Sequence, residues 1–526
     1  MLPKEEIRLQ LVLLLLAIGP VLALGQPVAI LAPYDQPYRP QYHFSPRENW
    51  TNDPNGLVYF EGEYHLFFQY NPFGDEWGHM TWGHAISHDL VHWVQLPPAI
   101  PEKNGIMIFT GSTVVDERNT SGFCTNNKSC LVAIYTGHTP KNSGHPALQT
   151  QNLAFSNDRG RTWTKYSGNP VLDLHLPDFR DPKVFWSRQT RRWVMVVSLP
   201  NDHKVRIYGS ADLKHWSALS DFGPAGATGG QWECPELFEL PIEGRQGETR
   251  WVLKIGLNPG AFQGGSGEQY FVGRFDGTRF INDNPLSETM WTDYGKDCYC
   301  SLTFNNLPPG HRTVTIGWMN NWQYAKDLPT SPWRGQMTFP RSLRLRKTPE
   351  GLRLVQMPVD QLRRLEQKGS EAGKTGTVEI VNRWLASNSD LTKGGAFQLT
   401  AEIPLGTAQE VGWRILEGNG NYTVLGYERK ARRLFFDRTH SGLINISKNF
   451  PQRTKATLVL QKAVLRLNVL VDRNSVEIFA DDGRLAATNL VFPPADANGI
   501  EVYAKGGQAG KISAHIAPIQ SIWTAF

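Results

Sequence analysis

The sequence predicts an all-β protein that consists of a five-bladed β-propeller followed by a β-sandwich. Three observations support this fold class: a weakly repeated unit in the first two thirds of the chain, five strand openings at comparable spacing, and a largely alternating polar–apolar pattern in the last third. The 526 residues also exceed the usual size of a single hydrophobic core, so we expect two domains.

Residues 1–25 have the features of a secretory signal peptide. Lys4 and Arg8 precede an apolar run that is interrupted by Gly19-Pro20 and ends near the small residue Gly25. A membrane anchor is the alternative, but the interrupted run is short for a bilayer span. We therefore predict a secreted, extracellular protein that has no membrane association after the signal is cleaved.

A unit made of a short strand, an Asp-containing turn and an aromatic residue recurs along the chain. Its copies are His84–Trp93, Leu153–Trp163 and Arg206–Trp216, with a degenerate fourth at Phe271–Phe280. A β-rich run such as Tyr64–Tyr70 precedes each copy. The repeated unit therefore predicts the blade of a propeller.

Five polar strand openings follow one another at intervals of roughly 50–70 residues, which is a blade-like spacing. They are Asp53-Pro54-Asn55-Gly56, Thr110-Gly111-Ser112, Arg180-Asp181-Pro182, Glu233-Cys234-Pro235 and Asp297-Cys298-Tyr299. If each opening strand is the innermost of its blade, these side chains converge at one end of the central channel. We predict a five-bladed propeller over residues 38–342.

The composition changes after the predicted propeller. Residues 343–376 are charged and helical in pattern, which indicates a linker, and residues 377–526 return to β-strands, which predicts a sandwich. Carboxylates of this second domain are expected to face solvent. Its clearest alternating segments are 397–403, 456–460, 465–471 and 476–479.

Charge and composition favour a neutral ligand. The formal charge is only +5, and we find no Lys/Arg block that would indicate a nucleic-acid partner or an anionic membrane. The 17 Trp residues supply flat rings that suit carbohydrate surfaces, although core packing is the commoner role of any one of them.

Two carboxyl groups are candidates for glycosidic-bond hydrolysis, which needs one group to attack or activate water and another to protonate the leaving oxygen. Asp53 lies in a turn-like sequence that ends in Gly56, and an ordinary Asx turn is the alternative. Glu233 lies between Trp232 and Cys234, an apolar setting that is expected to raise a carboxyl pKa. The alternative for Glu233 is a solvent-facing strand residue.

Two further carboxylates compete for roles at the same openings. Glu236 lies three residues beyond Glu233 and past Pro235, so we expect it to point away from the channel. Asp181 could simply pair with Arg180. Its position at a blade opening instead favours a carboxylate that accepts hydrogen bonds from sugar hydroxyls and supports the transition state.

The chain resembles glycoside hydrolase family 32, which contains invertases, exo-inulinases and levanases, from about Tyr38 to the C-terminus. The resemblance rests on several ordered motifs: Trp50-Thr51-Asn52-Asp53-Pro54-Asn55-Gly56, Phe68-Gln69-Tyr70-Asn71-Pro72, Phe179-Arg180-Asp181-Pro182, Trp232-Glu233-Cys234-Pro235, Gly317-Trp318-Met319-Asn320-Asn321-Trp322 and Val471–Phe479.

The resemblance implies a retaining β-fructosidase without cofactor or metal. It assigns Asp53 as nucleophile, Glu233 as acid/base and Asp181 as transition-state stabiliser. The substrate is a terminal β-fructofuranosyl residue of sucrose, inulin or levan, and the loops do not rank these three. The implied fructose-binding residues are Asn52, Gln69, Trp77, Phe109, Ser112, Arg180 and Trp322.

The sequence departs from the family pattern at three places near these motifs. Thr51 stands where many relatives have Met, Thr110 where Ser is frequent, and Asp297-Cys298-Tyr299-Cys300 where Asp-Phe-Tyr-Ala is typical. None of these departures removes a catalytic group. The two cysteines are expected to alter the pocket wall or to make it sensitive to thiol reagents.

Five cysteines are present, and the spacing of Cys124 and Cys130 would allow a hairpin disulfide. We expect Cys298 and Cys300 to be free thiols. Three alternatives to the hydrolase remain open: a fructosyltransferase, a catalytically inactive sugar-binding relative, and a propeller that binds protein partners.

Overall fold

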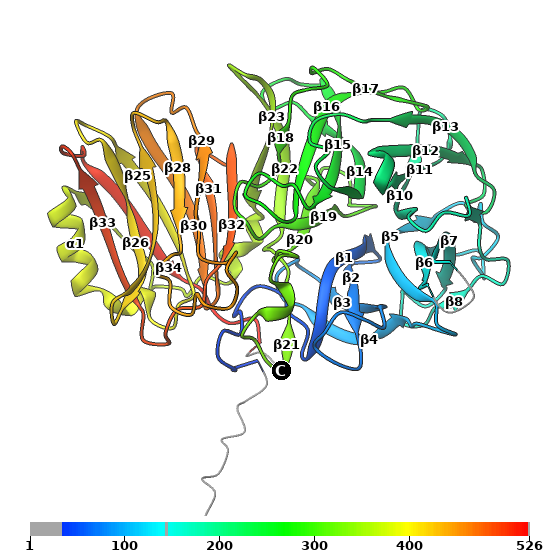
Figure 1. Cartoon of the computed structure of the whole chain (residues 1–526), viewed down its shortest axis with the longest axis horizontal. Helices are drawn as coiled ribbons and strands as arrows, with labels where there is room; N and C mark the ends of the chain where they lie inside the picture. Colours follow the sequence, from blue (N-terminus) through cyan, green and yellow to red (C-terminus); the bar gives the residue numbers. More distant parts are fainter. Residues whose placement is uncertain (1–33, 142–145, 524–526) are drawn as a thin grey trace, which may run out of the picture.

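The first strand of each of five β-sheets faces a common central axis, and two further sheets pack face to face beside them (Figure 1). This arrangement is seen in a computed structural model that describes residues 34–141 and 146–523. Within those residues the five sheets form a propeller and the other two form a sandwich, as the sequence predicts. The predicted signal peptide lies outside the described residues.

The propeller sheets follow chain order, and each begins with its innermost strand. The first sheet contains β1 (Asn49–Phe60), β2 (Glu63–Asn71), β3 (Thr81–Ser87) and β4 (Val94–Ile100); the second contains β5 (Met107–Asp116), β6 (Cys130–Thr139), β7 (Leu148–Ser156), β8 (Thr164–Lys165) and β9 (Leu172–Asp173); the third contains β10 (Arg180–Ser187), β11 (Arg192–Leu199), β12 (Lys204–Ser210) and β13 (Ser217–Phe222); the fourth contains β14 (Gln231–Pro241), β15 (Thr249–Asn258), β16 (Gly267–Phe275), β17 (Phe280–Asn282) and β18 (Met290–Trp291); the fifth contains β19 (Tyr299–Thr303), β20 (Val314–Trp318), β22 (Arg341–Thr348) and β23 (Gly351–Pro358).

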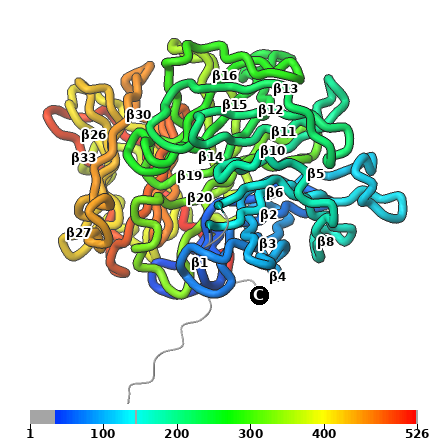
Figure 2. The backbone as a smooth tube through the Cα atoms, turned by 45° about the vertical axis from the view of Figure 1, so that its right-hand side comes forward, coloured from blue at the N-terminus to red at the C-terminus, as the bar shows by residue number. Residues whose placement is uncertain are grey.

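The contacts between the innermost strands form a closed ring, and Figure 2 views the propeller from a second direction. Strand β1 contacts β5, β5 contacts β10, β10 contacts β14, β14 contacts β19, and β19 returns to β1. The short strand β21 (Trp333–Arg334) leaves the fifth blade and pairs in parallel with β1, so it ties the last blade to the first. The blade openings, although far apart in sequence, therefore surround one channel.

Apolar side chains from neighbouring blades pack against each other and cover both faces of the sheets. Val58, Phe67 and Trp82 of the first blade join Leu131 and Ala133 of the second in one buried cluster. Strands buried on both faces have nearly continuous apolar sequences, and every residue of β2 is buried. This packing explains why the strand pattern of the propeller does not alternate strictly.

The sandwich consists of one six-stranded and one five-stranded sheet, and side chains from both sheets fill a single core between them. In spatial order, the first sheet contains β24 (Ala372–Gly376), β34 (Ile512–Pro518), β25 (Phe397–Pro404), β30 (Val464–Asp472), β31 (Ser475–Ala480) and β32 (Leu485–Leu490); the second contains β29 (Arg453–Thr457), β28 (Arg433–Asp437), β27 (Asn421–Glu428), β26 (Glu410–Gly418) and β33 (Gly499–Lys505).

Residues 341–358 form β22 and β23, which pair along their whole length. The first half of the segment expected to be a linker therefore lies within the fifth propeller sheet, because its charged residues alternate with buried ones such as Leu345 and Val355. We propose that the propeller domain extends to Pro358. The short 3₁₀ helices η1 (Pro200–Asp202) and η2 (Ala325–Asp327) lie within the propeller, and η3 (Asp360–Arg364) follows it.

One α-helix, α1 (Val378–Ser387), was not anticipated within the sandwich. Thr377 caps it by accepting a hydrogen bond from the Ile380 N–H. Val381 and Leu385, spaced by one turn, are its buried residues, and the 3₁₀ helix η4 (Ser389–Thr392) follows it. Among the described residues, no helix is long and apolar enough to span a membrane.

The expectation that sandwich carboxylates face solvent is wrong for Asp472 and Glu477, which are fully buried at the contact with the propeller. The ring nitrogens of His43 lie 2.8 Å from Asp472 Oδ2 and 3.1 Å from Glu477 Oε2. Burial alone would lower the pKa of His43, but these two hydrogen-bonded carboxylates raise it to about 9. Arg341 pairs with Glu477 from the other side.

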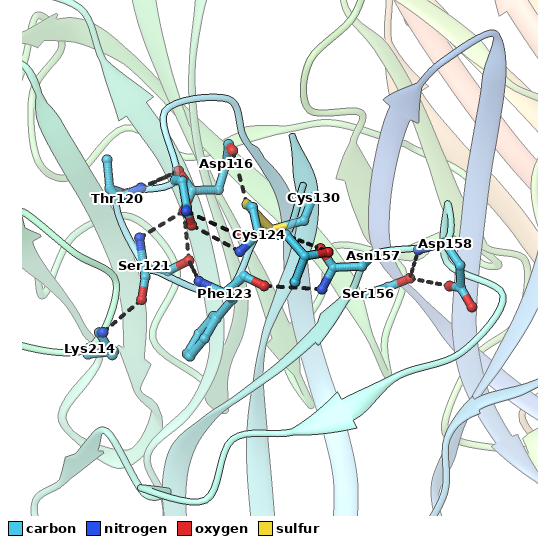
Figure 3. The surroundings of a disulfide bond; sticks show 12 residues. Asp116, Thr120, Ser121, Phe123, Cys124, Cys130, Ser156, Asn157, Asp158 and Lys214 are labelled. Atoms are coloured by element: carbon cyan, nitrogen blue, oxygen red, sulfur yellow. Dashed lines mark hydrogen bonds between the residues drawn. A yellow bond between two sulfur atoms is a disulfide. The ribbon is translucent and has the colours of Figure 1, made fainter. Parts of the chain in front are cut away.

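Cys124 and Cys130 are joined by a disulfide in the hairpin between β5 and β6 (Figure 3). The carboxamide oxygen of Asn119 accepts a 2.9 Å hydrogen bond from the Cys124 N–H. This disulfide lies in the loop at the end of β5 opposite to the strand opening, so it is remote from the residues predicted to act on a ligand.

Candidate active site

All five innermost strands of the propeller are irregular at their opening ends. The register of each ladder shifts at Thr51/Pro54, Ile108/Gly111, Arg180/Lys183, Glu233/Glu236 and Tyr299/Leu302. A β-bulge redirects the side chains around it and is frequent beside active sites. The five bulges therefore present polar side chains to the channel where regular strands would alternate.

These bulges surround a cavity of about 320 Å³. It brings together the three predicted catalytic carboxylates and six of the seven predicted binding residues. Its lining residues are Asn52, Asp53, Gln69, Trp77, Phe109, Thr110, His138, Gln149, Asp178, Arg180, Asp181, Glu233, Asn258 and Trp322.

Ser112 is the predicted binding residue that does not line this cavity. It is buried, and its hydroxyl accepts a 2.9 Å hydrogen bond from the Val184 N–H, which links β5 to β10. Conversely, our sequence reasoning missed His138, Gln149 and Asp178. Asp178 lies two residues before Arg180 and pairs with its guanidinium at 2.7 Å, whereas His138 and Gln149 carry no local motif that marks them.

A larger cavity, of about 650 Å³, lies at the opposite ends of β5 and β10. Its buried carboxylate, Asp116, already accepts hydrogen bonds from the hydroxyls and N–H groups of Thr120 and Ser121. The smaller cavity, which gathers three carboxylates, is therefore the better candidate for hydrolytic chemistry.

Glu233 lies at the start of β14 and is held by two donors. Arg180 approaches its Oε1 atom with Nη2 at 2.9 Å and Nε at 3.2 Å, and the Tyr299 hydroxyl donates to Oε2. The expected apolar setting is therefore wrong. The indole of Trp232 is buried between the third and fourth blades instead of contacting the carboxylate.

Glu236 points into the body of the propeller, as expected from its position beyond Pro235. Its side chain is fully buried and forms a 3.0 Å ion pair with Lys183 Nζ. The Thr303 N–H donates a hydrogen bond of 3.0 Å to its Oε2 atom. Since Glu236 does not line the cavity, it is a structural carboxylate below the site.

Asp53 lies inside β1, so the turn expected at Asp53-Pro54-Asn55-Gly56 is a bulged strand instead. The Thr110 hydroxyl donates a 3.0 Å hydrogen bond to Asp53 Oδ2. Burial, followed by the negative charges of Asp181 and Glu233, raises the pKa of Asp53 to about 8.

Asp181 occupies a left-handed backbone conformation, with φ at 68°. Its Oδ2 atom accepts a 2.9 Å hydrogen bond from the Cys234 N–H. Burial raises the pKa of Asp181 to about 7 against the lowering effect of Arg180, and Glu233 raises it further. The ion pairs of Arg180 are with Asp178 and Glu233, so the simple Arg180–Asp181 pair considered from the sequence is not what holds this carboxylate.

Aromatic rings form part of the cavity wall. Trp322 packs beside Trp50 and Trp318, with ring centroids 5.9 Å and 4.7 Å away. Phe109 stacks on the His138 ring at 4.5 Å. Trp77 remains 45% exposed, so its face is available to a ligand at the cavity mouth.

The expectation that Cys300 is a free thiol is wrong. Cys300 forms a disulfide with Cys234, whose Cα lies 5.5 Å away, whereas Cys298 is buried and free. This pair could not be predicted from local sequence, because its members are 66 residues apart. Only the ring of innermost strands brings β14 and β19 together.

The family models match nearly the whole described chain. Residues 43–358 match the glycosyl hydrolases family 32 N-terminal domain, and residues 359–519 match the family 32 C-terminal domain. Together these two matches define the chain as a glycoside hydrolase. The chain belongs to glycoside hydrolase family 32.

Individual relatives agree with this assignment. A levanase of Bacillus subtilis (strain 168) is 45% identical over 93% of this chain and 72% of its own length, and an extracellular exo-inulinase of Aspergillus awamori is 40% identical over 93% and 96%. The crystal structure of the Aspergillus awamori exo-inulinase superimposes with a TM-score of 0.87, at 39% identity over 93% of this chain and 100% of that one. A β-fructofuranosidase of Schwanniomyces occidentalis, complexed with fructosyl-erythritol, superimposes with a TM-score of 0.81, at 34% identity over 93% and 99%.

Proposed function

We propose that this family 32 β-fructosidase is a secreted exo-acting enzyme that releases terminal β-fructofuranosyl residues from sucrose, inulin or levan. The observation that carries the proposal is the convergence of Asp53, Asp181 and Glu233 on one cavity of about 320 Å³. That volume is at the lower end for small-ligand sites, which suits one terminal sugar better than the middle of a chain.

The proposed reaction is a double displacement with retention. Asp53 attacks C2 of the fructosyl unit while Glu233 protonates the departing oxygen, which breaks the glycosidic bond and leaves a fructosyl ester on Asp53. Glu233, now ionised, then removes a proton from water. That water attacks C2, releases fructose and regenerates the Asp53 carboxylate.

Asp181 is proposed to stabilise the oxocarbenium-like transition state through its carboxylate. Both Asp53 and Asp181 must lose their protons for these roles. Burial and the negative charge of Glu233 raise the pKa of both groups, so both ionise more readily while Glu233 carries the proton that the acid step requires.

Secretion is proposed from the sequence of residues 1–25 and from the relatives described as extracellular exo-inulinases. The presence of all three carboxylates around the cavity favours an enzyme over an inactive sugar-binding relative. A fructosyltransferase differs only in the acceptor of the second step, so product analysis at high sucrose concentration distinguishes the two.

Fructose release from sucrose, inulin and levan by the purified protein tests the proposal. We expect release by the wild type, its loss in Asp53→Ala and Glu233→Gln, and its retention in Glu239→Gln, which alters an exposed carboxylate on the same strand β14. No release from any of the three substrates by folded wild-type protein would contradict the hydrolase.

A further inference from the structure

The Cys234–Cys300 disulfide lies directly beneath the proposed catalytic carboxylates. Cys234 follows Glu233 on β14, and Cys300 follows Tyr299 on β19. The bond therefore joins the innermost strands of the fourth and fifth blades at the level of the cavity. A carboxylate oxygen of Asp53 and the two sulfur atoms all lie within 4.8 Å of one another.

The two half-cystines are connected to the site by short contacts of their own strands. The Cys234 N–H donates to Asp181 Oδ2 at 2.9 Å, and the residue before Cys300, Tyr299, donates its hydroxyl to Glu233 Oε2. Because Asp181 lies on β10, a shift of β14 relative to its two neighbours β10 and β19 would disturb both contacts at once.

The backbone at both half-cystines is in the left-handed region. Cys234 has φ at 48° and Cys300 at 45°, and each falls within the bulge of its strand. Such conformations are unfavourable for non-glycine residues and persist where the surroundings fix them. A covalent link between the two bulges is one such constraint.

We propose that the Cys234–Cys300 disulfide is a positioning element of the active site, which holds the Glu233–Tyr299 and Cys234–Asp181 contacts in register. The inference rests on the proposed function, because it concerns the geometry of the reacting carboxylates. Cys234 and Cys300 are positioning residues: they act through Glu233, Tyr299 and Asp181.

The matched control is the other disulfide of the chain. Cys124–Cys130 closes a separation of six residues on a hairpin at the opposite end of β5, and within the described residues the hydrogen bonds of Cys124 are to Asn119 and Asp116, outside the candidate active-site cavity. Removing it should affect local stability alone, whereas removing Cys234–Cys300 should also change the kinetics. Cys300→Ala and the milder Cys300→Ser remove the Cys234–Cys300 disulfide, and Cys124→Ala/Cys130→Ala removes the control disulfide.

The pH profile separates positioning from general stability. Burial and the negative charges of Glu233 and Asp53 disfavour ionised Asp181. The positive charge of Arg180 and the hydrogen bond from the Cys234 N–H favour it. Because that N–H holds the pKa of Asp181 down, its displacement would raise the pKa, and ionised Asp181 would then require a higher pH. The acidic limb of kcat/KM should therefore move to higher pH.

The experiment measures steady-state fructose release from sucrose across pH, together with the unfolding temperature of each variant. We expect kcat to fall about tenfold in Cys300→Ala and Cys300→Ser, with KM within about twofold and the acidic limb displaced, and neither change in the control. An active wild type combined with unchanged kcat and pH profile in the Cys300 variants would overturn the positioning role. An inactive wild type would instead contradict the proposed function.

A second readout needs no variant to fold. Active wild-type protein is denatured without reductant and its free thiols are then alkylated. We expect Cys298 alone to be labelled. Labelling of Cys234 and Cys300 in fully active enzyme would overturn the proposal, because activity would then not need the bond.

Discussion

Arg180 Nη2 lies 2.9 Å from Glu233 Oε1, and this contact joins the third and fourth propeller blades inside the candidate active site. Nε of the same guanidinium approaches the same oxygen at 3.2 Å. Arg180 therefore orients the proposed acid/base through a planar group that a lysine cannot reproduce.

Arg180→Lys should lower kcat/KM for sucrose by about 100-fold, the lower end for loss of one preorganised donor. The control is Arg206→Lys, because Arg206 makes a comparable two-point contact with Asp221 outside the cavity. We expect wild-type kinetics in that variant. Equal activity of Arg180→Lys and the wild type would show that the contact does not orient Glu233.

Asp53→Asn should abolish fructose release yet stabilise the fold at alkaline pH. Asp53 has a pKa raised to about 8, so the folded state is favoured while Asp53 is protonated and loses this advantage as the pH rises from about 4 through 8. The amide removes that charge. We expect an unfolding temperature a few degrees above wild type at pH 8 and nearly equal to it at pH 4.

Thermal unfolding of the two proteins at both pH values measures this difference, with Asp221→Asn as a control in which an exposed Arg206 partner is lost. A lower unfolding temperature of Asp53→Asn at pH 8 would contradict the assignment of Asp53 as a destabilising buried charge.

His43→Gln should destabilise the contact between propeller and sandwich most strongly below pH 6.5. The pKa of His43 is raised to about 9, so its contribution is fully present below pH 6.5 and is lost as the pH rises through 9. Removing the cation leaves Asp472 and Glu477 buried with less compensation, a change that costs about 3–5 kcal/mol.

Denaturant unfolding at pH 6 and pH 10 tests the prediction for His43. His215→Gln is the control, because His215 pairs with Asp212 while its side chain is 88% exposed, and we expect a loss within about 0.5 kcal/mol. A His43→Gln deficit that is equal at both pH values would rule out protonated His43 as the stabilising species.

Trp77→Ala should raise KM several-fold for sucrose and leave kcat nearly unchanged, because the ring stands at the cavity mouth and contributes binding that is equal in ground and transition states. Phe73→Ala is the matched control: Phe73 is 77% exposed but does not line the cavity. A fall in kcat with constant KM would place Trp77 at the reacting centre instead.

Much of this arrangement could be predicted from the sequence because the evidence was local. Four of the five blade openings combine a polar group with Pro or Gly before an apolar strand, so Asp53, Asp181 and Glu233 could be selected without knowing their distances. The propeller's end could not be placed, because β22 and β23 carry alternating charges that resemble a polar connecting segment.

The features that sequence reasoning missed depend on contacts between distant segments. Cys300 forms its disulfide with Cys234 only because the ring of blades brings their strands together. The guanidinium that pairs with Glu233 belongs to Arg180 of the preceding blade. Asp472 becomes a buried partner of His43 only because the N-terminal segment crosses to the sandwich, 429 residues away in sequence. None of these contacts produces a periodic pattern.

The central claim, that Asp53 is the nucleophile of a double displacement, is tested most directly by trapping the ester. Glu233→Gln is incubated with β-fructofuranosyl fluoride, whose leaving group needs no protonation, so the first step proceeds while the second lacks its base. Peptide mass spectrometry after acid quenching should find a fructosyl group on Asp53. A fructosyl group on Asp181 or another residue, or turnover that leaves no ester on Asp53, would contradict the account.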